Sequence, residues 1–157
     1  MTAAIAVESP LSQDVRVLIA ELNAVLLELT PPEHCYHLTP EEMASPDTTV
    51  FVVREGGAPI ACGALKRHGR IGEVKRMYTR PPYQGRGIGG RILAEIEGLA
   101  RAQGIEQLVL ETGDRHPAAW RVYERAGFAR CDAVLDYPES PWSVFYAKRL
   151  LREATAA

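Results

Sequence analysis

The stretch Gln84-Gly85-Arg86-Gly87-Ile88-Gly89-Gly90 decides how this chain folds, since it joins a strand-like segment to a long amphipathic one. Its four glycines let the backbone turn tightly and approach a ligand with no Cβ in the way. A helix that begins there directs free N–H groups and the positive end of its dipole outward, which suits phosphate or pyrophosphate. The stretch therefore predicts an anion-binding turn for a phosphate-bearing cofactor.

Strand-like and helix-like patterns alternate on both sides of the turn. The predicted strands cover residues 3–7, 49–54, 59–66, 71–79, 107–111, 128–135 and 143–150. The predicted helices cover residues 10–29, 40–44, 87–103 and 117–127, and Ser9 is the expected cap of the first helix. The order predicts a mixed α/β sheet whose only clear crossover runs through the glycine turn.

Composition narrows the class of protein. The chain has 157 residues, 46% of them hydrophobic, which predicts a single domain over residues 1–157. A net charge of −2 gives no sign of a nucleic-acid or membrane binder. Cys35, Cys62 and Cys131 lie far apart and favour reduced thiols over a disulfide framework or a zinc site. With no signal peptide and no apolar span of about 20 residues, we expect a cytoplasmic protein without a metal.

Two other phosphate-binding motifs were compared with the turn. The pattern Gly85-x-Gly87-x-x-Gly90 fits the dinucleotide fingerprint of oxidoreductases, but a lone match is weak. The loop Arg80-Pro81-Pro82-Tyr83-Gln84 separates the strand from the glycines, and a single strand–helix–strand unit is too little for a doubly wound sheet. A P-loop is excluded because no Gly-Lys-Ser/Thr follows.

A second pair of motifs accounts for more of the chain. Gln84-x-x-Gly87-x-Gly89 resembles the acyl-CoA pyrophosphate loop of the GNAT superfamily of N-acetyltransferases, and residues 119–128 resemble that family's A-x-x-x-Y-x-x-x-G-F segment. The resemblance spans about residues 49 to 150. It implies an α/β (α+β) fold with a mixed, largely antiparallel central sheet of about seven strands and helices on both faces. It also implies acetyl transfer from acetyl-CoA to a primary amine by direct attack in a ternary complex. A non-catalytic acyl-CoA-binding regulatory module of the same fold is the alternative.

The resemblance also implies a set of cofactor contacts. Backbone N–H groups of the turn would bind the pyrophosphate, and the strand before it would line the pantetheine arm, with the N–H near Met77 polarising the thioester carbonyl. His116 stands where many members have an asparagine that reaches the pantetheine, and capping the next helix is its other role. Arg80 and Arg91, like Arg86, are candidates for phosphate contacts. The expected binding residues are Met77, Tyr78, Thr79, Gln84, Gly85, Arg86, Gly87, Ile88, Gly89, Gly90, His116 and Tyr123.

Two catalytic roles follow from the same resemblance. An acceptor amine with a pKa near ~10 must lose a proton before it attacks. Glu73 is the expected base, directly or through a water, although pairing with Lys75 or Arg76 would equally explain it; Glu111 is the reserve candidate. Tyr123 matches the family tyrosine that donates a proton to the departing sulfur of CoA.

Acceptor specificity is expected to come from residues 30–48 and 136–142. Acidic residues in these segments would favour a cationic acceptor, although solvated loops look the same; they are Glu33, Glu41, Glu42, Asp136 and Glu139. A small-molecule or peptide amine is expected as the acceptor, and aromatic residues near the last strands suggest a homodimer.

Overall fold

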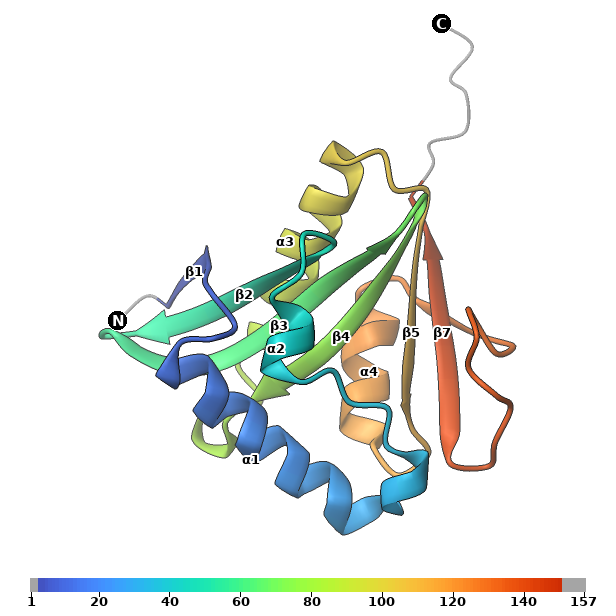
Figure 1. Ribbon diagram of the computed structural model, residues 1–157, viewed down its shortest axis with the longest axis horizontal. Helices are drawn as coiled ribbons and strands as arrows, with labels where there is room; N and C mark the ends of the chain where they lie inside the picture. The colour runs from blue at the N-terminus through green and yellow to red at the C-terminus, as the bar shows by residue number, and fades with distance from the viewer. Residues whose placement is uncertain (1–2, 151–157) are drawn as a thin grey trace, which may run out of the picture.

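The computed structural model describes residues 3–150. Its strands are β1 (Ala4–Val7), β2 (Thr48–Glu55), β3 (Ala58–His68), β4 (Ile71–Thr79), β5 (Gln107–Gly113), β6 (Ala129–Cys131) and β7 (Ser143–Arg149) (Figure 1). The α-helices are α1 (Gln13–Leu29), α2 (Pro40–Met43), α3 (Ile88–Ala102) and α4 (Pro117–Arg125). Short 3₁₀ turns occupy Pro32–His34 and Pro81–Tyr83.

All the strands form one sheet in the order β1-β2-β3-β4-β5-β7-β6. Neighbouring strands are antiparallel except β4 and β5, which run parallel and pair only from Ile71–Gln107 to Glu73–Val109. Beyond that point the two strands diverge and leave a V-shaped opening in the sheet (Figure 1). The expected mixed, largely antiparallel sheet is confirmed, and a doubly wound parallel sheet for dinucleotide binding is excluded.

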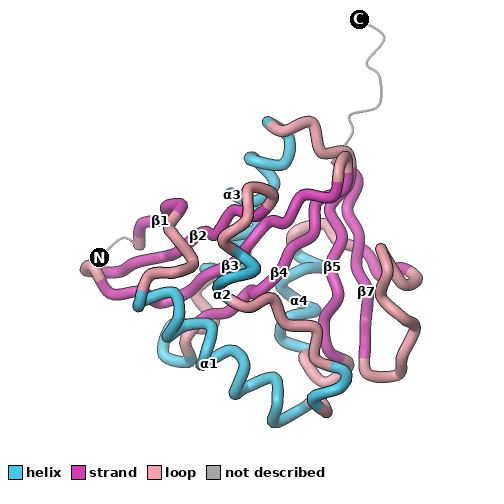
Figure 2. The backbone as a smooth tube through the Cα atoms, in the orientation of Figure 1, coloured by secondary structure: helices cyan, strands magenta, loops and turns pink. Residues whose placement is uncertain are grey.

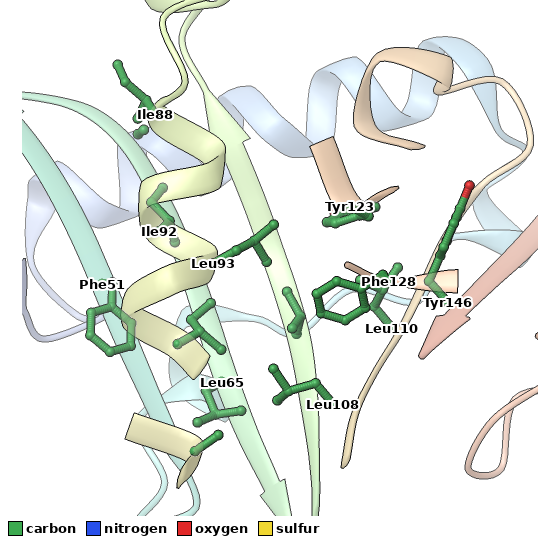
Figure 3. Packing of buried hydrophobic residues seen from close by; sticks show 14 of the residues in the cluster. Phe51, Leu65, Ile88, Ile92, Leu93, Leu108, Leu110, Tyr123, Phe128 and Tyr146 are labelled. Carbon is green, nitrogen blue, oxygen red and sulfur yellow. The ribbon is translucent and has the colours of Figure 1, made fainter. Parts of the chain in front are cut away.

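Helices cover both faces of this sheet (Figure 2). On one face, α1 buries the apolar stripe expected from its sequence against β2 and β3, with Val15, Leu18 and Ile19 in the contact. On the other face, α3 and α4 enclose the larger core cluster, in which Tyr123 lies close to Phe128 and Tyr146 (Figure 3). The larger cluster contains buried residues of both strands that border the opening, Val74 of β4 and Leu108 and Leu110 of β5.

A bulge interrupts β4 just where it leaves β5. The pairing with β3 shifts between Cys62 and Ala64, so that Gly63 faces both Arg76 and Met77. Arg76 takes a left-handed backbone conformation, with φ of 55°. A Cβ on Gly63 would lie 2.5 Å from the Met77 sulfur and 2.7 Å from the Ile92 methyl Cγ2. The bulge thus depends on a glycine in the neighbouring strand.

The clearest differences from the sequence prediction concern the first helix and the strand that follows the last helix. The first helix begins at Gln13, because the Ser12 hydroxyl accepts the Val15 N–H at 3.3 Å and caps it; Ser9 was the wrong choice. The strand predicted over 128–135 is reduced to β6, since the chain leaves the sheet and reaches a positive φ at Leu135. Residues 1–2 and 151–157 of the predicted domain lie outside the described residues.

Candidate active site

A cavity of about 100 Å³ occupies the opening between β4 and β5. Its walls come from the end of α1, the segment 34–37, both diverging strands and the start of α4. Five of the residues singled out from the sequence share it with charged neighbours on β4; the lining includes Glu73, Lys75, Arg76, Met77, Glu111, His116 and Tyr123. Residues that lie up to 50 positions apart are thereby brought to one place.

Glu73 is almost fully buried, and both of its carboxylate oxygens are engaged. Oε1 bonds to His68 Nε2 at 3.0 Å, while Oε2 accepts from Lys75 Nζ at 3.2 Å and from the Tyr137 hydroxyl. Lys75 also donates to the Tyr137 oxygen at 2.6 Å. The pairing with Lys75 considered from the sequence is therefore present, and Glu73 ties the segment 132–142 to the sheet.

Glu111 has a freer carboxylate. Its Oε2 accepts the Ser143 hydroxyl at 2.8 Å, and no other side-chain bond to it is found among residues 3–150. Burial raises the pKa of Glu111, and the charge of Glu73 acts in the same direction against the opposing effects of Ser143 and Lys75. A carboxylate with a raised pKa is a stronger proton acceptor than an exposed one.

Tyr123 extends from α4 into the same cavity. Its ring packs edge-on against Phe128, with centroids 6.1 Å apart, at the end of the core cluster (Figure 3). Within residues 3–150, no hydrogen bond to its hydroxyl is formed. Burial, followed by the charge of Glu111, raises the pKa of Tyr123, so the phenol keeps its proton at neutral pH.

The glycine turn leads directly into α3. Gly87 is its N-cap residue with φ of 76°, and Gly85 has φ of 80°, conformations that other residues adopt with strain. The N–H groups of Ile88, Gly89 and Gly90 have no intrahelical acceptor, because they belong to the first turn of the helix. No side chain caps them either. A Cβ on Gly85, Gly87 or Gly90 would meet nothing within 4 Å. The turn is thus an open cradle of N–H groups at the positive end of a helix dipole.

Nearby side chains brace this cradle. Gln84 Nε2 donates to the Thr79 carbonyl at 3.0 Å and holds the loop against the end of β4. The Tyr78 hydroxyl donates to Glu21 at 3.0 Å, and burial together with this carboxylate raises its pKa to about 12. Met77 lies at the bulge and lines the cavity. The backbone of 77–79 therefore runs along the opening, while the Tyr78 side chain is committed to α1.

The three candidate arginines are in different situations. Arg80 donates to both oxygens of Glu21, at 3.0 and 2.9 Å, and to the Pro59 carbonyl at 3.0 Å, so it anchors α1. Arg91 donates to the Ala3 carbonyl at 2.9 Å. Arg86 is exposed on the turn, 5.3 Å above the Tyr83 ring and 3.7 Å from Glu55. Arg86 is the arginine best placed to reach a phosphate at the turn.

His116 begins α4 but does not cap it with its ring. Its backbone carbonyl accepts the N–H groups of Ala119 and Trp120, whereas the ring makes no capping bond. Nε2 is buried without a partner, and burial lowers the pKa of the imidazole and keeps it neutral. An orphaned polar atom in the cavity wall fits a bound ligand with a complementary group.

Sequence reasoning missed one residue that lines the cavity and one that contacts its lining. Arg76 is only 7% exposed and lines the cavity, although from sequence alone it belongs to a scattered basic region. Tyr137 was expected only as part of an acceptor rim, and its bond to Glu73 joins positions far apart in the chain. The sequence offers one signal for Arg76, an arginine within a predicted strand, because arginine is rarely buried there without a partner.

No group of three or more His, Cys, Asp or Glu side chains in residues 3–150 is arranged to hold a metal ion. Over the same residues, no helix has the length and apolar character needed to cross a membrane.

Comparisons with known proteins agree with this geometry. The acetyltransferase (GNAT) family matches residues 19–128. An IAA acetyltransferase of Azospirillum brasilense is 40% identical over 93% of this chain and 97% of its own length. The uncharacterized N-acetyltransferase YsnE of Bacillus subtilis is 36% identical over 88% of this chain and 93% of its own length.

Solved structures give the same result. A structure described as an acyl-CoA N-acyltransferase of Klebsiella pneumoniae superposes with a TM-score of 0.81 at 30% identity, covering 96% of this chain and 99% of that one. The PaiA N-acetyltransferase of Thermoplasma acidophilum, in complex with coenzyme A, superposes with a TM-score of 0.76 over 95% of this chain and 99% of that one. At 18% identity the latter likeness concerns the fold alone.

Proposed function

This chain belongs to the GNAT family of acetyltransferases, and from that membership we propose that it moves an acetyl group from acetyl-CoA to a primary amine, with both substrates bound together. The observation that carries the proposal is the opening between β4 and β5, which brings Glu111 and Tyr123 to one cavity beside the glycine turn. A module that only binds acyl-CoA would have no use for a buried acid and base at this place.

For the cofactor, the open cradle at Gly85–Gly90 suits the pyrophosphate, with Arg86 as the neighbouring cation. The diverged backbone of Met77–Thr79 suits the pantetheine arm, and the unpartnered His116 Nε2 suits one of its amide groups. The unpaired backbone of the bulge near Met77 offers an N–H to the thioester carbonyl. When bound, acetyl-CoA supplies the activated acetyl group.

For the base, we propose Glu111 in place of Glu73. Glu111 lines the cavity, has one carboxylate oxygen without a hydrogen bond within residues 3–150 and has a raised pKa, whereas both oxygens of Glu73 are occupied by His68, Lys75 and Tyr137. Glu111 takes the proton of the amine as the nitrogen attacks the thioester carbon. Glu73 keeps the acceptor side of the site in place.

For the acid, we propose Tyr123. As the new C–N bond forms and the C–S bond breaks, the leaving sulfur gains the electron pair and needs a proton. The Tyr123 hydroxyl, protonated because its pKa is raised, is free to donate it. The proton held by Glu111 balances the one that Tyr123 loses, and exchange with solvent restores both groups.

Thermal melting with acetyl-CoA, free CoA and NAD in parallel tests the cofactor. A ligand at 100 times its dissociation constant stabilises by about 2.7 kcal/mol, a shift of roughly 5–10 °C for a domain of this size. We expect both CoA forms to raise the Tm and NAD to leave it unchanged. Release of CoA thiol in the presence of an amine panel then tests transfer. Stabilisation by CoA without release by any amine would favour the binding module.

The cytoplasmic location, the single domain and the homodimer remain predictions from the sequence. Fractionation of cells and sedimentation of the purified protein are the direct measurements of location and oligomeric state.

A further inference from the structure

Arg76 is a buried cation that has no acidic partner. It is 7% exposed, and among residues 3–150 its guanidinium makes one side-chain hydrogen bond, from Nη2 to the neutral Asn23 Oδ1 on α1. Nε is buried without any partner, and no carboxylate forms an ion pair with the group in the described part of the chain. Burial lowers the pKa of Arg76 to about 10, which leaves it charged at neutral pH. Buried charges in proteins are normally paired.

The backbone is strained in order to place this side chain. Lys75 pairs with Ala64 and Tyr78 pairs with Cys62, so both face the α1 side of the sheet. In a regular strand, side chains alternate between faces, so one of the two residues between them would point to the opposite face. The left-handed φ of 55° at Arg76 turns its side chain to the α1 side as well, where it meets Asn23. Non-glycine residues hold such conformations where the surroundings require them, often at ligand sites.

The other charges of the cavity are accounted for. Lys75 is paired with Glu73, and the Glu111 carboxylate accepts a hydrogen bond from the Ser143 hydroxyl. Two of the acids expected from the sequence to attract a cationic acceptor are engaged elsewhere: Glu41 pairs with Arg16, and Glu42 completes the capping box of α2. Arg76 is therefore the one cation of the cavity lining that forms no ion pair within residues 3–150.

We propose that Arg76, oriented by Asn23, binds an anionic group of the acceptor, so that the substrate is a small amine bearing a carboxylate or a similar oxyanion. This inference rests on the proposed acetyl transfer and adds the substrate class. The planar fork of a guanidinium pairs with a carboxylate through two parallel hydrogen bonds, and Nε is one of its unused donors. The cation also fixes which end of the acceptor is held, so the amine end points toward Glu111.

Matched pairs of acceptors test the proposal. Each proteinogenic L-amino acid is compared with its own carboxamide, which keeps the amine and removes the negative charge, and 2-aminoethylphosphonate represents the other oxyanion class. Initial rates of CoA release with saturating acetyl-CoA give kcat/KM. We expect at least one amino acid to exceed its amide by tenfold or more. A preference for the phosphonate over every amino acid would retain the oxyanion site and reject the carboxylate.

Variants of Arg76 and Asn23 give a second test of the proposed anion site. In Arg76→Gln the preference for acid over amide should fall at least tenfold, while Arg76→Lys restores part of it. Asn23→Ala should weaken the preference less than Arg76→Gln. A merely structural role for Arg76 would lower the rates with acids and amides alike and leave their ratio unchanged, which would overturn the proposal.

The experiments distinguish a failure of the proposed acetyl transfer from a failure of the proposed anion site. The Tm shift caused by CoA should be the same in Arg76→Gln and in the wild type, since Arg76 lies on the acceptor side. If only amides and simple amines are acetylated, the transferase stands and the anion site is wrong. If nothing is acetylated, but amino acids raise the Tm of the CoA-bound wild type and not of Arg76→Gln, the site stands without the reaction. No turnover and no Tm shift with any member of the panel would reject the anion site.

Discussion

Tyr123 offers the sharpest test at the scale of single residues. Replacing it with phenylalanine removes the hydroxyl and leaves the ring packed against Phe128. Because general acid catalysis contributes on the order of 100-fold or more, kcat should fall about that much, while the dissociation constant for CoA changes little. Tyr146→Phe is the matched control, since the Tyr146 hydroxyl bonds to Glu124, away from the cavity. Equal turnover in Tyr123→Phe and the wild type would remove the role.

Variants of the two buried carboxylates, Glu111 and Glu73, should differ in how kcat depends on pH. Glu111 acts only when deprotonated, so kcat in the wild type should rise with pH through a pKa above the ordinary value of 4.5. Glu111→Gln should lower kcat and abolish this rise. Glu73→Gln should keep the rise and increase KM for the amine, because it loosens Tyr137 and the segment it holds. The opposite pattern in the two variants would restore Glu73 as the base.

Glu111 should also lower the stability of the folded protein, by an amount that depends on pH. Its pKa is raised in the folded state, so the folded protein binds more protons than the unfolded chain above about pH 4.5. The stability of the wild type therefore falls as pH rises from the unfolded pKa through the folded one. Glu111→Gln should melt at a higher temperature than the wild type at pH 7, and the difference should vanish near pH 4. A constant difference across this range would contradict the assigned cause.

At the scale of elements, the bulge in β4 depends on Gly63. The Cβ of Gly63→Ala would press on the Met77 sulfur and the Ile92 side chain, and overpacking of this kind costs roughly 1–3 kcal/mol. Gly98→Ala is the matched control, because its Cβ would lie in open space within α3 and should stabilise by about 0.5–1 kcal/mol. Denaturant unfolding measures both changes. Equal effects would show that the bulge tolerates a side chain there.

The elements themselves were largely predictable, and the bulge was not. β4 has the predicted bounds of Ile71–Thr79, and α3 differs by one residue at each end, since periodic burial of apolar side chains is a local signal. The conformation of Arg76 depends on its pairing with Gly63, and the role of Glu73 on its contact with Tyr137. Contacts between distant positions leave no mark in local periodicity, so the proposed preference for Glu111 over Glu73 and the proposed anion site required the structure.

At the scale of the whole molecule, cofactor binding should be visible as local protection of the backbone. Hydrogen exchange should slow at Val74–Thr79 and Gly85–Gly90 when CoA is added, because these N–H groups border the opening and the turn. β2, paired on both sides, should change little. Uniform slowing of the entire sheet would instead indicate general stabilisation without a defined contact.

The divergence of β4 from β5 also has a consequence for how the protein behaves at high concentration. Past Glu73 and Val109, each strand presents an unpaired edge to the other inside an otherwise continuous sheet. Such an edge is a template on which an extended segment of another chain can add, the usual start of edge-to-edge aggregation. Acetyl-CoA bound along the opening, as proposed, should therefore have a second effect, because it would shield this edge. A preparation depleted of the cofactor should self-associate sooner in storage than one kept saturated with it, and light scattering would record the difference.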